Sequence, residues 1–230
     1  MEYIVIISIL IAILIALYFI LEINIKKVKE IADNKRLNEL ANKFPENLDI
    51  CKSILKDLNN ENVKIEEEKE SKTSLYLVMQ NKIIIANNRE SFTRIQTISH
   101  ECIHSIQSKR MLMFNYIYSN FYLIYFALIS VLTIFKIVNN TMLQVEILTI
   151  LGYIYYFIRN MLENDAMIKA RYLAKEYMEQ SKYCSIEEIK EIIDGYDKLN
   201  NIGIKGVSLN LFFNVIIKII IYCIICIIVI

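Results

Sequence analysis

The chain has only two histidines among its 230 residues, His100 and His104, and they stand four residues apart. Residues with this spacing share one face of an α-helix, so both imidazole rings can reach one metal ion. Glu101 directly follows the first histidine, where a carboxylate can take a proton from a water molecule that the metal activates. The pattern H-E-x-x-H predicts a metal-dependent hydrolytic site with Glu101 as the base. The alternative is a surface helix that carries two histidines by chance.

Two histidines are too few for a catalytic zinc ion, which usually has three protein ligands and a water molecule. The chain has no third histidine, and no glycine stands where the H-E-x-x-H-x-x-G-x-x-H proteins have one. The third ligand is then a carboxylate or a thiolate. Cys102 lies off the histidine face and is expected in the core. Glu163 is the best candidate, because it lies just beyond the third apolar span, on the side expected to be cytoplasmic, where a helix is predicted. The alternative for Glu163 is a solvated charge near the start of a helix.

The hydrophobic residues form 55% of the chain, with a mean hydropathy of +0.37, and they are concentrated in long blocks. We therefore expect an α+β membrane protein, mostly α-helical, with about four transmembrane helices and a small β-hairpin or sheet beside the motif helix. The predicted segments are an N-terminal transmembrane anchor at 1–22, a cytoplasmic metal-motif domain at 23–111, a transmembrane hairpin at 112–158, a cytoplasmic helical segment at 159–206 and a C-terminal transmembrane helix at 207–230.

Positive charge predicts the orientation in the membrane. Of the 26 Lys and Arg residues, 16 lie within 23–111 and 8 within 159–206. Because such clusters stay on the cytoplasmic side, both polar segments are expected there, and the hairpin between them returns the chain to the same side. A formal net charge of +1 does not indicate nucleic-acid binding. The five cysteines have no framework spacing and are expected as free thiols.

Shorter patterns predict the elements around the motif. Helical spacing is expected from Asn24 to about Phe44, and from Glu46 to Leu58. The segments Ser74 to Met79 and Lys82 to Ala86 are strand candidates in a hairpin. The motif helix is expected to begin at Ser91, and two more helices at Met161–Met178 and Ile186–Leu199. If Lys82 to Ala86 is an exposed edge, it could align a peptide by β-addition.

The motif and a downstream acidic segment together resemble the YugP-like membrane zinc metallopeptidases, of the gluzincin type, through His100-Glu101-x-x-His104-x-Ile106-Gln107 and Glu163-x-Asp165-Ala166. The strand pair before the motif is also similar to that family, so the resemblance covers roughly residues 60–175. Two positions depart from the family pattern. Ile103 stands where glycine is usual, and Met167-Ile168 replaces smaller or polar residues.

The resemblance implies a zinc (Zn2+) site in which His100, His104 and Glu163 are the ligands and Glu101 is the base. It also implies that Asp165 is a supporting carboxylate that orients a histidine ring, as such partners do in metal sites. The alternative for Asp165 is an ion pair with Lys169 at i+4. The oxyanion partner stays open among a tyrosine, Lys169 and Arg171.

The expected function is that of a membrane-anchored zinc metalloendopeptidase, a hydrolase acting on peptide or protein substrates, including membrane proteins. Its expected location is the bacterial cell membrane, in contact with the lipid bilayer, with the site facing the cytoplasm. The alternative is a catalytically inactive metal-binding membrane scaffold or sensor. A small multi-span scaffold or transporter component with an accidental motif is a third hypothesis, although the low glycine content and the lack of repeated spans count against transport. Lys218, within the last apolar run, is either functional or a snorkelling side chain.

Overall fold

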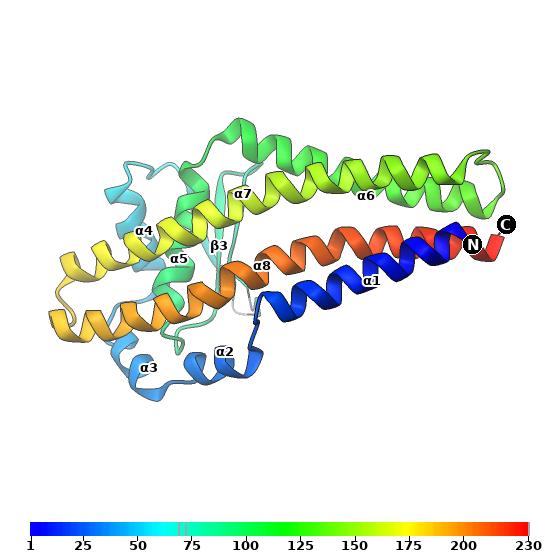
Figure 1. The fold of residues 1–230 in the computed structure, drawn as a ribbon. Helices are drawn as coiled ribbons and strands as arrows, with labels where there is room; N and C mark the ends of the chain where they lie inside the picture. Colours follow the sequence, from blue (N-terminus) through cyan, green and yellow to red (C-terminus); the bar gives the residue numbers. More distant parts are fainter. Residues whose placement is uncertain (69, 72, 230) are drawn as a thin grey trace. The chain divides into compact units, whose positions relative to one another are not determined.

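The structure, a computed structural model, describes residues 1–68, 70–71 and 73–229 (Figure 1). Its elements follow in this order: α1 (Glu2–Ile20), α2 (Ile25–Ala32), α3 (Lys35–Ala41), α4 (Asn47–Asp57), β1 (Lys64–Glu68), β2 (Leu75–Leu77), β3 (Lys82–Ala86), α5 (Arg94–Ile106), α6 (Lys109–Ile134), α7 (Thr141–Ser181) and α8 (Ile186–Val229). The described chain is mostly helical with one small sheet. This confirms the α+β class.

Four helices, α1, α6, α7 and α8, are long and apolar enough to cross a membrane. The chain divides into two compact units. The first unit contains 1–23, 114–161 and 205–230, and the second contains 24–113 and 162–204. In the first unit, α6 and α7 form a hairpin (Figure 1), in which the Tyr118 hydroxyl donates to the Leu151 carbonyl at 3.1 Å.

The structure differs from the predicted helices at several ends. The segment Asn24 to Phe44 is not one helix, because Asn34 begins a second helix by accepting a hydrogen bond from the Leu37 backbone N–H. The helix α7 runs without a break through the predicted boundary at 158–161, and α8 runs without a break through 199–207. A change from apolar to polar composition therefore alters the surroundings of these helices but not their backbone.

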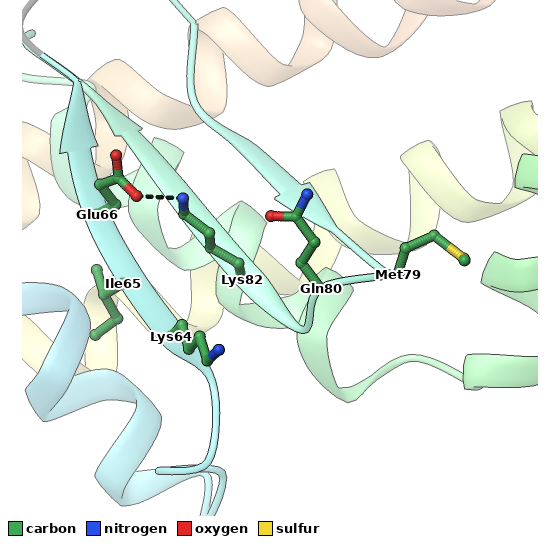
Figure 2. A pocket seen from close by; sticks show the side chains of 6 residues that line it. All are labelled: Lys64, Ile65, Glu66, Met79, Gln80 and Lys82. Atoms are coloured by element: carbon green, nitrogen blue, oxygen red, sulfur yellow. Dashed lines mark ion pairs between the residues drawn. The ribbon is translucent and has the colours of Figure 1, made fainter.

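The second unit contains a three-stranded sheet in the order β1-β3-β2. The strand β3 pairs in parallel with β1 and antiparallel with β2, so the predicted hairpin is present. The prediction that Lys82 to Ala86 is an exposed edge is wrong, since both of its edges are occupied. Three consecutive glutamates, Glu66, Glu67 and Glu68, belong to β1, where Glu66 forms an ion pair with Lys82 across the strands (Figure 2). That pair lies in an open hollow, which none of the predicted metal ligands lines.

The core of the second unit fixes the start of the motif helix. Arg94, the first residue of α5, is fully buried and donates hydrogen bonds to the carbonyls of Ala41, Phe44 and Pro45. Phe92 stacks on Tyr196 of α8, with ring centroids 5.7 Å apart, and its carbonyl accepts from the Tyr196 hydroxyl. These contacts attach the start of α5 to the end of α3, to the connection between α3 and α4, and to α8. The helix carrying both histidines is therefore rigidly held within its unit.

Candidate metal centre

The motif helix α5 begins at Arg94, three residues later than predicted. Ser91 instead forms a turn, in which its carbonyl accepts from the Arg94 backbone N–H at 3.1 Å. The helix covers the whole H-E-x-x-H pattern, and its opposite side is buried. Cys102 is fully buried beside Cys51, with their sulfur atoms 3.8 Å apart, so the prediction of a core role for Cys102 is confirmed.

His100, His104 and Glu163 converge on one point in the second unit. The Nε2 atoms of the two histidines are 3.0 Å apart. The Oε2 atom of Glu163 lies 3.4 Å from Nε2 of His100 and 3.6 Å from Nε2 of His104. Each of the three side chains keeps between 12% and 20% of its surface exposed. Glu163 lies well inside α7 rather than at a helix start, so the alternative role at a helix end is excluded.

These three residues form a group that could hold a metal ion. Bonds of about 2.0 to 2.2 Å at tetrahedral angles place neighbouring ligand atoms about 3.3 to 3.5 Å apart. The three separations of 3.0, 3.4 and 3.6 Å bracket that range. Two neutral ring nitrogens and one carboxylate oxygen are ligands that suit a divalent ion such as zinc. The donor set therefore fits a metal with one position left for a further ligand.

Gln107 determines which nitrogen of His104 is available. The Gln107 side-chain N–H2 donates to the Leu162 carbonyl at 3.0 Å and to an Asp165 carboxylate oxygen at 2.8 Å. Because both partners are acceptors, the Gln107 side-chain oxygen must face His104, whose Nδ1 lies 2.8 Å away. Nδ1 then carries the ring proton in the neutral form, and Nε2 presents a lone pair to the site.

Electrostatics in the site favour a positive charge. Burial lowers the pKa of His104, but the hydrogen bond with Glu163, the charge of Glu101 and the contact with Gln107 outweigh burial, so the net pKa is raised. The two carboxylates therefore stabilise a proton on His104. A divalent cation at the same point would be stabilised by the same charges.

Glu101 lies beside the two histidines and is almost fully buried, with 6% of its surface exposed. Burial raises the pKa of its carboxyl group, and the nearby His100 and His104 only partly oppose that effect. The backbone N–H of Tyr76 in β2 donates a hydrogen bond to the carboxylate. The edge strand β2 therefore contacts the predicted base.

Asp165 is linked to His104 through Gln107, and its role in orienting the histidine ring stays a prediction. It accepts from Gln107, which in turn accepts from His104, so its effect reaches the ring through the amide. Its other oxygen accepts from Lys169 at 2.7 Å, so the alternative ion pair is present as well. Burial raises the pKa of Asp165, but the hydrogen bonds from Lys169 and Gln107 outweigh burial and leave the pKa below its ordinary value.

Gln107 is the supporting residue that the sequence interpretation missed. It was part of the recognised pattern, but no role followed from its type. The available signal was its position three residues after His104, where side chains on a helix are neighbours. The departure at Ile103 leaves this arrangement intact, because its apolar side chain is buried and only its backbone carbonyl bonds to Gln107, accepting from the Gln107 backbone N–H at 3.1 Å.

Comparison with known proteins does not extend these observations. No protein-family model, no curated protein and no solved structure matches the chain. The resemblance to the YugP-like metallopeptidases stays a prediction based on the motif residues, and the geometry of the second unit is the basis on which a function can be proposed.

Proposed function

We propose that the chain is a membrane-bound zinc metallopeptidase that hydrolyses peptide bonds. The observation that carries this proposal is the convergence of His100, His104 and Glu163 within 3.0 to 3.6 Å, with the Glu101 carboxylate buried beside them. A metal used only for structure needs no such carboxylate. Glu101 is the feature that favours hydrolysis over a scaffold or sensor.

A bound zinc ion supplies Lewis-acid chemistry, which makes water acidic near neutral pH and polarises a carbonyl group. Glu101 accepts the proton of the attacking water and later delivers it to the leaving amine. Its raised pKa suits both roles, because a general base works best when its pKa approaches the working pH. The N–H of Tyr76 holds the carboxylate in place, and Gln107 holds the ring of His104.

The location belongs to the same proposal. Four apolar helices support an integral membrane protein, and the concentration of Lys and Arg in the two polar segments supports a cytoplasmic site in a bacterial cell membrane. The substrates are then peptides or proteins accessible from the cytoplasm, including membrane proteins.

The test is metal analysis and peptide cleavage by the full-length protein in detergent micelles, comparing wild type with Glu101→Gln. We expect both proteins to bind one zinc ion each, and only the wild type to cleave. The loss should be at least 100-fold, the effect of removing general acid–base catalysis. Equal zinc binding with equal residual cleavage would leave the scaffold or sensor as the better description, and the absence of zinc from both would remove the metal site.

A further inference from the structure

Gln96 extends the histidine face of α5 by one turn. It lies four residues before His100 and eight before His104, so the three side chains follow one side of the helix. Its side-chain N–H donates to the Asn200 side-chain oxygen of α8 at 2.6 Å. Both side chains are half-buried. An amide pair therefore lies one helical turn before His100 along α5.

The same part of α8 also approaches the helix that carries Glu163. Gly203 lies one turn after Asn200, and a Cβ atom there would be only 3.1 Å from the terminal methyl group of Met167. Met167 in turn lies one turn after Glu163 on α7. Asn200 and Gly203 of α8 thus contact the metal-bearing helices α5 and α7 at positions one turn from a histidine and from the carboxylate.

The other candidate donors are engaged elsewhere. The ammonium group of Lys169 is 2.7 Å from Asp165, and Arg171 makes two bonds of 2.7 Å to Asp197. The hydroxyl of Tyr76 donates to Asn81 at 2.8 Å. By contrast, within the described part of the chain the amide N–H groups of Asn200 have no acceptor, since only its oxygen is bonded.

We propose that Asn200 binds the carbonyl oxygen of the peptide under attack. This inference rests on the proposed peptidase activity. Gln96 holds the Asn200 oxygen, which leaves the two N–H groups to donate as negative charge develops on the substrate oxygen. Hydrogen bonds of this kind stabilise a transition state more than the ground state. Gln96 acts through Asn200 and is a positioning residue.

The experiment compares Asn200→Ala, Asn200→Asp and Gln96→Ala with wild type, with Asn201→Ala as the control at the neighbouring exposed position. We expect both Asn200 variants to keep their zinc and to lose roughly 100-fold in kcat with little change in KM, the effect of removing one oxyanion donor. Asn200→Asp keeps the shape of the side chain and can still accept from Gln96, so it tests the donor even if the alanine variant is unstable. Gln96→Ala should lower kcat by a smaller factor than the Asn200 variants. Added to Asn200→Ala, it should lower kcat no further.

A second measurement separates this role from packing. A phosphinic peptide built on a cleaved sequence carries a tetrahedral oxyanion, and it should bind the Asn200 variants about 100-fold more weakly than wild type. Cleavage and inhibitor binding within twofold of wild type would overturn the role of Asn200, while a normal loss in Glu101→Gln would leave the peptidase intact. A zinc-loaded wild type that cleaves no better than Glu101→Gln would instead overturn the peptidase and this inference together.

Discussion

The side-chain oxygen of Gln107 lies 2.8 Å from Nδ1 of His104, and the other end of the same amide bonds to the helix that carries Glu163. Gln107 directly follows α5, yet its N–H2 group is bonded to Leu162 and Asp165 of α7. The amide therefore connects the helix with the histidines to the helix with the carboxylate. The amide fixes the tautomer of His104. Through Leu162 and Asp165 it also holds the turn of α7 that carries Glu163 next to α5.

Gln107→Leu should weaken zinc binding by roughly 10- to 100-fold, the usual effect of removing a partner of a ligating histidine. The leucine fills similar space but accepts nothing from Nδ1, so His104 is free to rotate and to place its proton on Nε2. Competition with a chromogenic chelator measures the affinity. Gln180→Leu, at an exposed position of α7, is the control. An unchanged affinity in Gln107→Leu would show that the amide does not hold the ring.

Asp165→Asn should also weaken zinc binding, but only through Gln107. The asparagine keeps one acceptor but loses the charge that attracts the amide N–H, so the effect should be smaller than that of Gln107→Leu. The two substitutions should not be additive, with a coupling of roughly 0.5 to 3 kcal/mol for side chains in contact. Lys169→Met should leave the affinity unchanged, because Lys169 is exposed and such pairs contribute about 1 kcal/mol at most. Additive losses in the double variant would exclude the connection.

Local patterns in the sequence predicted the motif helix and the β2–β3 hairpin, because both depend on near neighbours along the chain. The prediction that Glu163 joins the two histidines as the third ligand required an argument from membrane topology, since 59 residues separate Glu163 from His104. The parallel pairing of β1 with β3 had no local signal, and it turned the expected edge into the central strand. The link from Asp165 to His104 through Gln107 also had no local signal. The sequence cannot show that an amide stands between a carboxylate and an imidazole 61 residues away.

Arg94→Met should destabilise the second unit by roughly 3 kcal/mol or more. The methionine fills much of the space, but the carbonyls of Ala41, Phe44 and Pro45 would each lose a donor, at about 1 to 3 kcal/mol for a buried group left unpaired. Chemical denaturation monitored by circular dichroism measures the loss. The matched control is Arg89→Met, which removes an exposed ion pair with Glu46 and should change stability by less than about 1 kcal/mol. Equal effects of the two substitutions would contradict the structural role of Arg94.

Two glycines of α8 should respond in opposite ways to alanine. At Gly195 the new methyl group would lie 2.8 Å from Leu37 and 3.0 Å from Phe92. Overpacking of this kind costs about 1 to 3 kcal/mol, which exceeds the gain in helix propensity from glycine to alanine, so Gly195→Ala should destabilise the second unit. At Gly206 nothing lies within 4 Å, so Gly206→Ala should stabilise by up to about 1 kcal/mol. Thermal unfolding of both variants gives the signs. A gain at Gly195 would show that α8 is not packed this closely against α3.

Removal of the metal should lower the free energy of unfolding of the protein, and that free energy should rise with the concentration of free zinc. A ligand that binds only the folded state stabilises it by about 2.7 kcal/mol at 100 times its Kd. Chelation should therefore lower the melting temperature of the wild type, and added zinc should restore it. His100→Ala and Glu163→Ala remove one of the three ligand atoms that lie within 3.6 Å of one another, so both variants should lose most of this response. Glu101→Gln should keep it, because the base is not a ligand. If the melting temperature of Glu163→Ala rises with zinc as much as that of the wild type, the carboxylate of α7 does not bind the metal, and the centre must use another third ligand.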